Sequence, residues 1–414
     1  MRYQTWATLT VIPLTVLVGC SGKAGSADPT GASSDGNTAG WKAGTDKVSF
    51  GLIGPMTGPF AVLGISQQNS LNVVIDQINK EGGIGGAQVV LETRDSGLDP
   101  GKAVQQANEF AGNQQVKMVV GPSITSFYNA AKGAFEQNKM INCQPAVAAG
   151  TFADLKYGFR SQDPNALNVD KMLAYLKTDA KVKKVGLIYE ADDTGSFFDQ
   201  QFRDKAPQQG LEYVGWEKTV ADDASHLAYV QALKAKGAEA IWISTNPAGA
   251  KTMAAKKAAG YDGILMGGSG LFNIAFIEAA GDAAAGTVFS SSNYPWLLRD
   301  RASWQAGYRT HIEAIEKKYG VNVGPKSGAT SPKGTAIAAD CAYAYAKAAE
   351  QAKSLDADKV AQALEALHVP SAETPSGNSI NPGKNHEFYG IDDIHLYKWE
   401  KDAKGWFATE VTPK

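Results

Sequence analysis

The sequence predicts an α/β protein built from two doubly wound lobes, each with a mainly parallel sheet that helices cover on both faces. Short apolar strands alternate with helices in two successive series along the chain, and this alternation is typical of parallel sheets. The 414 residues are also too many for one compact core of ordinary size. Between the two series stands the polar stretch "YGFRSQDPN", residues 157–165, where Pro164 indicates a break.

The first series begins at Lys47 with the β-rich run "KVSFGLIGPMTG", which ends in Gly and Pro. In the following helix, residues 64–83, apolar side chains recur at helical spacing and Gly82-Gly83 suits a C-terminal cap. The series then continues with strands at 87–96, 116–123 and 140–146, and with helices at 99–112 and 126–139.

The second series predicts strands at 183–193, 211–219, 238–247, 263–270 and 287–293, with helices at 196–206, 225–237, 248–260 and 273–281. Beyond it, the chain predicts helices at 301–320, 334–354 and 357–368, and a β-rich tail at 377–399 and 405–411. Periodicity alone does not assign these last elements to either lobe.

The N-terminus has the order of a secretory signal peptide. Arg2 supplies a positive charge, residues 6–18 are apolar, and Leu17-Val18-Gly19-Cys20 closes the run. The apolar run is shorter than the roughly 20 residues that a membrane-spanning helix needs. Its end resembles the lipobox of bacterial lipoproteins, which implies that Cys20 is acylated and becomes the mature N-terminus; the alternative is a signal peptide that happens to end in Cys. Residues 21–46, rich in small polar residues, are expected to form a flexible tether.

Composition restricts the possible functions. A net charge of -2 provides no field for nucleic acid. The 5 histidines lack metal-ligand spacing, so we expect no metal and no cofactor. Of the 3 cysteines, Cys143 and Cys341 remain once Cys20 is lipidated. In an oxidising compartment this pair could form a disulfide, or both could be buried free thiols.

Several segments carry a resemblance to a known family. "VSFGLIGPMTGPFAVLGISQQNSLNVVIDQINKEGGIGG" is similar to the opening of the leucine/isoleucine/valine-binding family of bacterial ABC transporters. The segments "VVGPSITS", "YGFRSQDPN", "VGLIYEADDTG", "LMGGSGLFN" and "SGNSINPGKNHEFYGIDDIHLYKW" follow in the family's order. The resemblance implies a type I periplasmic-binding fold, in which three crossovers join the two lobes. It places 47–161 and 294–370 in lobe one, and 162–293 and 371–414 in lobe two.

The resemblance also implies ligand-contact positions in lobe one. Thr125 and Ser126 follow the third strand, where family members hold a ligand carboxylate; both would also suit the cap of the next helix. Ala146 and Ala148 follow the fourth strand, and Ala148 replaces the family's usual hydroxyl. Leu63 and Phe60 are apolar candidates near the ligand side chain, or ordinary core residues.

In lobe two, Thr194 and Thr245 resemble the family's pocket tyrosines, although Thr194 also suits a helix cap. Ser269 stands where amino-acid binders place a glutamate for the ligand's ammonium. Burying an ammonium without a carboxylate partner costs several kcal/mol, so Ser269 favours a ligand without an ammonium. The alternatives are that Asp192, Asp193 or Asp222 replaces the missing acid, or that Ser269 is only a turn residue.

No enzyme motif fits. Around Ser269, Leu271 stands where a nucleophile elbow requires glycine, and "GLIGPMTG" does not match a dinucleotide fingerprint. We therefore expect a non-enzymatic, extracytoplasmic lipoprotein, a monomer anchored to the membrane, which delivers a small-molecule ligand to an ABC permease. The alternative is a sensor that reports ligand occupancy to a membrane receptor through the same closing cleft.

Overall fold

The computed structural model describes residues 41–58, 60–146, 150–220, 222–244, 247–271, 274–292, 300–320 and 332–411. The predicted signal peptide 1–20, the lipidation residue Cys20 and most of the tether lie outside these residues. Residues 41–46, which the sequence assigned to the tether, contact the folded chain: the Trp41 Nε1 donates to Glu350 Oε2 at 2.6 Å, and the Ala43 amide donates to the Gly85 carbonyl at 3.0 Å.

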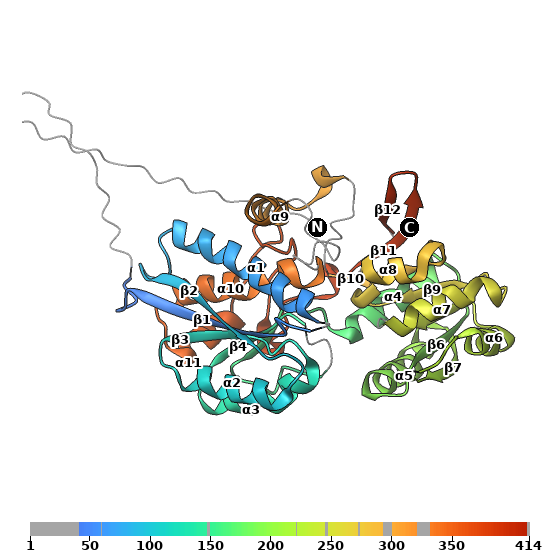
Figure 1. Ribbon diagram of the computed structural model, residues 1–414, viewed down its shortest axis with the longest axis horizontal. Coiled ribbons are helices and arrows are strands. Elements are labelled where there is room, and N and C mark those ends of the chain that lie inside the picture. Colours follow the sequence, from blue (N-terminus) through green and yellow to red (C-terminus); the bar gives the residue numbers. More distant parts are fainter. Residues whose placement is uncertain are drawn as a thin grey trace, which may run out of the picture. The chain divides into compact units, whose positions relative to one another are not determined.

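The first sheet has five parallel strands in the order β2-β1-β3-β4-β5 (Figure 1). Its strands are β1 (Lys47–Gly54), β2 (Gln88–Asp95), β3 (Val116–Val120), β4 (Ile141–Gln144) and β5 (Gly158–Arg160). The helices between them are α1 (Ala61–Lys80), α2 (Pro100–Gly112) and α3 (Thr125–Gln137). The order confirms the doubly wound parallel sheet, because β1 lies between β2 and β3. β5 lies inside the stretch that the sequence indicated as a break, since a strand of three residues is too short to show periodicity.

Two separate apolar cores cover the faces of this sheet. One core joins β1 to α1 and to the late helices α10 (Pro332–Ala352) and α11 (Ala357–Glu365). The other joins β3 to α2 and α3, and Figure 1 shows these helices on the opposite face from α1. The first core also includes Ile380, Phe388 and Tyr389, which lie beyond residue 370, where we expected lobe one to end. The lobe boundaries themselves remain a prediction.

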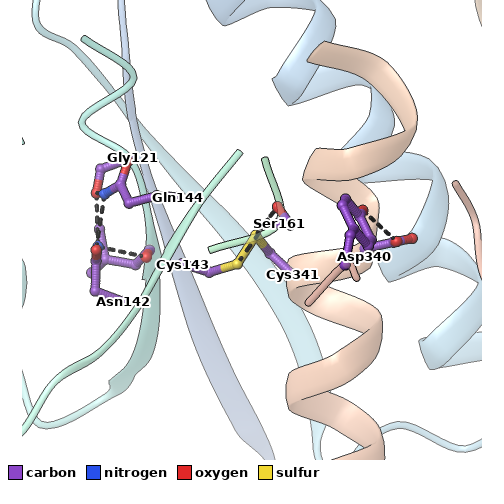
Figure 2. Close-up of a disulfide and its surroundings, with 9 residues drawn as sticks. Gly121, Asn142, Cys143, Gln144, Ser161, Asp340 and Cys341 are labelled. Atoms are coloured by element: carbon purple, nitrogen blue, oxygen red, sulfur yellow. Dashed lines mark hydrogen bonds between the residues drawn. A yellow bond between two sulfur atoms is a disulfide. The ribbon is translucent and has the colours of Figure 1, made fainter. Parts of the chain in front are cut away.

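A further helix and a disulfide complete this part of the chain. α9 (Ala306–Tyr319) packs against α1 through Ile312 and Ile315. Cys143 of β4 is bonded to Cys341 of α10, with a Cα–Cα distance of 5.7 Å (Figure 2). Of the two states that the sequence left open for these cysteines, the structure therefore contains the disulfide.

The second sheet has seven strands in the order β12-β11-β10-β9-β8-β6-β7. Its strands are β6 (Lys184–Glu190), β7 (Glu212–Thr219), β8 (Ala240–Ile243), β9 (Ile264–Gly267), β10 (Val288–Ser291), β11 (His395–Asp402) and β12 (Gly405–Glu410). Strands β6 to β10 are parallel, while β11 and β12 add an antiparallel edge. The helices are α4 (Asn165–Thr178), α5 (Asp193–Lys205), α6 (Leu227–Ala235), α7 (Pro247–Ala258) and α8 (Ile274–Ala280).

The seven-stranded sheet is also covered on both faces. α4 and α5 pack on one face around Trp242, and residues of α6, α7 and α8 pack on the other with Trp399. Successive residues of β6 alternate between these cores: Leu187 and Tyr189 belong to the first, and Ile188 belongs to the second. The two sheets with their helices confirm the predicted α/β architecture of two lobes.

Candidate functional site

The candidate site lies where the parallel strands of both sheets end. In open α/β sheets, ligands bind beyond the carboxyl ends of the strands, where loops and helix N-termini present free backbone donors. In the five-stranded sheet, β1 ends at Gly54, β2 at Asp95 and β4 at Gln144. In the seven-stranded sheet, β6 ends at Glu190 and β9 at Gly267.

Asp95 fixes the loop that follows β1. Its Oδ1 accepts the Met56 and Gly97 amides, each at 2.8 Å, and its Oδ2 accepts the Thr57 hydroxyl at 2.7 Å. Burial alone would raise the pKa of the Asp95 carboxyl, but the hydrogen bonds from Thr57 and the two amides outweigh it and hold the pKa below its usual value. The carboxylate is therefore a structural anchor that is already occupied.

Side-chain amides fix the loop that follows β3. Asn142 and Gln144 each donate to the Gly121 carbonyl at 2.7 Å, and Gln144 also donates to Asn142 Oδ1 at 2.9 Å (Figure 2). Beyond Gly121, the buried Ser123 hydroxyl donates to Gln67 of α1 at 2.6 Å. These contacts hold the chain in place immediately before α3, whose first residue is Thr125.

The predicted lobe-one residues follow three neighbouring strands of this edge. Thr125 is half-buried and Ser126 exposed at the start of α3, and Ala146 is half-buried just after β4. Leu63 is half-buried in the first turn of α1, whereas Phe60 is 54% exposed. Ala148 lies outside the described residues. The topology thus brings Thr125, Ala146 and Leu63 to one sheet edge, while their contact with a ligand remains a prediction.

The alternative capping roles were wrong. The N-cap residue of α3 is Ile124, and no side chain makes a cap hydrogen bond there. In α5 the N-cap is Asp192, whose Oδ1 accepts the Gly195 amide at 2.8 Å, so Thr194 is already inside the helix. Sequence pattern could not separate these positions because a cap depends on where the backbone becomes helical.

Ser269 is buried in a polar network at the second edge. It is 3% exposed and lies just beyond β9, and the Gln162 side-chain amide donates to its hydroxyl at 3.4 Å. Gln162 also donates to Asp163, at 2.5 Å, and the carboxylate of Asp163 further accepts Asn168 at 2.5 Å and Ser292 at 2.9 Å. Asp163 is fully buried, with hydrogen bonds to both of its oxygens.

The end of β6 carries a second acid, the half-buried Glu190. The Ser244 hydroxyl donates to Glu190 Oε1 at 2.9 Å. The other oxygen, Oε2, is shielded from solvent and has no hydrogen-bond partner within the described ranges. Thr194 is half-buried four residues further on, whereas Thr245 lies outside the described residues. Asp192, Asp193 and Asp222, the acids considered as substitutes for the family's glutamate, are all exposed.

A cavity of about 620 Å³ lies elsewhere. It is bounded by α4 and α5 residues, by the loop at 150–153 and by residues 379–393, and the described ligand-contact candidates are not among its lining residues. Arg160 and Glu387, which both line this cavity, form a bidentate ion pair at 2.5 and 2.6 Å. This cavity therefore does not coincide with the predicted ligand contacts.

Within the part of the chain that the structure describes, there is no helix with the length and apolar character required to cross a membrane. Nor do the described histidines, cysteines and acids come together in a group of three or more that could hold a metal ion.

Comparison with known proteins identifies the class of protein that has this fold. The family model described as "Periplasmic binding protein" matches residues 47–404. The chain is also similar to a leucine-, isoleucine-, valine-, threonine-, and alanine-binding protein of Pseudomonas aeruginosa, with 27% identity over 88% of this chain and 93% of that protein. The chain belongs to the periplasmic binding proteins, in the branched-chain amino acid-binding family that its sequence resembles.

Solved structures show the same type I fold with chemically different ligands. One is the branched-chain amino acid transporter substrate binding protein LivJ from Streptococcus pneumoniae in complex with isoleucine, with a TM-score of 0.69 and 19% identity over 88% of this chain and 100% of that chain. Another is a solute binding protein from R. palustris in complex with 4-hydroxybenzoate, with a TM-score of 0.72 and 18% identity over 88% and 96%. The first of these ligands carries an ammonium and the second does not, so the fold alone does not decide this chain's ligand.

Sequence reasoning missed the polar residues, most of them buried, that organise both edges. Asn142, Gln144, Gln162, Asp163 and Glu190 were read only as parts of strands or of the break. Their signal was a polar side chain that ends or directly follows an apolar strand, as in "INCQ" and "VGLIYE". Such a residue is buried only if a partner satisfies it, and key partners come from distant parts of the sequence, as Gly121 does for Gln144 and Ser292 for Asp163.

Proposed function

We propose that this protein is the extracytoplasmic solute-binding lipoprotein of an ABC importer of the branched-chain amino acid type. It captures a small organic ligand between its two lobes and delivers it to a membrane permease. The observation that carries the proposal is the family match over residues 47–404, combined with two mainly parallel sheets whose strand ends carry the candidate contacts.

The proposed anchor is the acylated Cys20, joined to the folded chain by a tether that ends before Trp41. The contacts of Trp41 and Ala43 with Glu350 and Gly85 support a start of the folded region at this point. A soluble form for measurements should therefore begin at or before Trp41, so that these contacts are kept.

Delivery to a permease is favoured over sensing. The relatives in this family carry binding-protein and transporter names, whereas a sensor would use the same closing cleft without transport. Permease and ATPase genes beside this gene would support delivery, and a lone sensor-kinase gene would support signalling.

The ligand is either an amino acid or, because Ser269 replaces the family's glutamate, a related compound without an ammonium. Its test is a thermal-shift screen of the soluble form against branched-chain amino acids, aromatic and aliphatic carboxylates, amides and polyols. A true ligand raises the melting temperature because it binds the folded state. A shift with leucine, isoleucine or valine would contradict the inference from Ser269, and a screen in which no compound produces a shift would contradict small-molecule capture.

A further inference from the structure

We propose that Glu190, at the end of β6, is the anionic partner of a cationic nitrogen on the ligand, so that this protein binds an ammonium-bearing solute although Ser269 replaces the family's acid. This inference rests on the proposed function, because it names the ligand class of the same cleft. It reverses the ligand preference that Ser269 alone suggests.

The first observation is the state of the Glu190 carboxylate. Oε1 accepts the Ser244 hydroxyl at 2.9 Å, while Oε2 is shielded from solvent and unpartnered among the residues the structure places. A buried carboxylate oxygen without a donor is costly, and native proteins rarely retain one without a reason. An arriving ammonium would supply the missing donor and a compensating charge.

The second observation is that the neighbouring acids are already occupied or exposed. Asp163 accepts three side-chain donors, and Asp192 caps α5. Asp193 and Asp222 are exposed, where water competes for an ammonium. Glu190 therefore fits the substitute role better than the three aspartates that the sequence suggested.

The third observation concerns nearby protein cations. Glu190 takes part in none of the ion pairs found among the described residues. Lys251 donates to the backbone carbonyl of Asp223. Burial lowers the pKa of the His226 imidazole below its usual value, so this ring is neutral at pH 7 and does not neutralise the carboxylate. The negative charge of Glu190 remains available to a ligand.

Sheet geometry places Glu190 on the edge where the ligand is expected. It is the last residue of β6, four residues before Thr194, and Ser244 directly follows the adjacent strand β8. β9, which precedes Ser269, is the next strand after β8. Two strand spacings separate β6 from β9, about 10 Å along the edge, so the cationic nitrogen would bind at a position shifted from the one Ser269 occupies.

The test compares the wild-type protein with E190Q, which removes the charge and keeps an oxygen for Ser244. Two matched probe pairs differ by one ammonium: leucine and 4-methylpentanoate, and 5-aminopentanoate and pentanoate. We expect an ammonium-bearing member to bind the wild type, and E190Q to weaken its binding by about 10- to 100-fold, as expected for a lost charged hydrogen bond. S244A controls for a purely structural effect of the Glu190–Ser244 contact, and D192N controls for loss of a nearby exposed charge.

A second readout needs no ligand. If the Glu190 carboxylate has no cationic partner until the ligand binds, its charge does not stabilise the unliganded protein. Removing that charge should then leave the melting temperature of the unliganded protein unchanged or raise it. A lower melting temperature for unliganded E190Q, matching that of S244A, would assign Glu190 a structural role and overturn the inference. Binding of only the ammonium-free probes, unchanged in E190Q, would overturn it while leaving solute capture intact. Failure of the thermal-shift panel and of all four probes would overturn both.

Discussion

Asp95 and Glu190 occupy the same kind of position in the two sheets, and their surroundings differ. Each is the acid that ends a parallel strand, β2 in the five-stranded sheet and β6 in the seven-stranded sheet. Asp95 accepts two backbone amides and one hydroxyl. Glu190 accepts one hydroxyl, and its second oxygen is shielded from solvent and has no donor among the described residues.

This difference separates two roles for a polar residue at a strand end. In the five-stranded sheet, the side chains of Asp95, Asn142 and Gln144 form hydrogen bonds with loops of the same sheet. These bonds fix the backbone that follows β1 and β3. A fixed backbone loses less entropy when a ligand binds. We infer that the five-stranded edge provides a rigid platform, and that side chains of the seven-stranded edge select among ligands.

The largest effect should come from the disulfide beneath the five-stranded edge. It closes a loop of 198 residues, and in the chain-entropy model such a cross-link stabilises the folded state by about 5 kcal/mol. We expect C143A/C341A to lower the free energy of unfolding in urea by an amount of this order. Reductant should destabilise the wild type and leave the double variant unchanged; equal stability of the two proteins would show that the platform does not depend on the cross-link.

A smaller loss is expected from Asp95. D95A leaves the Met56 and Gly97 amides without their acceptor, which should cost about 2–3 kcal/mol in urea unfolding. Because the folded state lowers the pKa of Asp95, this stabilisation is present above its ordinary pKa of 3.8 and is lost as the pH falls below that value. D95A should weaken the binding of all ligands to a similar extent. A change in ligand selectivity in D95A would contradict the difference in role between Asp95 and Glu190.

The two strand-end acids also show what the sequence could and could not predict. Both lie at the end of a predicted strand, in "AQVVLETRDS" and "KKVGLIYEADD", so the local pattern predicts the strand and an acid near its end in each case. Their different environments depend on Met56, Thr57 and Ser244, which only the fold brings within reach, whereas Gly97 is a local neighbour of Asp95. The alternating elements and the family resemblance thus predicted the fold, while the polar partners of the site required tertiary contacts.

A third carboxylate, that of Asp340, shows whether the number of hydrogen-bond donors to a carboxylate is enough to keep it ionised. Asp340 of α10 accepts the Ser376 amide, the Ser376 hydroxyl and the Tyr389 hydroxyl, at 3.0, 2.5 and 2.8 Å. Burial nevertheless dominates and raises the pKa of Asp340 to about 7. Its contribution to stability is therefore fully present below about pH 4 and is lost as the pH rises through 7.

The measurement is urea unfolding between pH 4 and pH 7 for the wild type and D340N. The titration of Asp340 contributes a slope of at most about 1.4 kcal/mol per pH unit, with stability falling as the pH rises. D340N should lack this contribution, so the difference in stability between the two proteins should change steadily across the range. Parallel pH profiles would show that Asp340 is ionised in the folded state, like Asp95.

The smallest effect is expected at Asp192, an exposed acid of the seven-stranded edge that lies two residues after Glu190. Its carboxylate caps α5 through the Gly195 amide at 2.8 Å, so D192A should cost about 1 kcal/mol in urea unfolding. D193A, one residue further along and also exposed, lacks that cap contact and serves as the matched control. Neither change should alter ligand selectivity, because exposed carboxylates are screened by water. A change in ligand selectivity that is larger in D192A than in E190Q would show that the ligand's cationic group contacts Asp192. Glu190 would then have no role in selectivity that distinguishes it from Asp95.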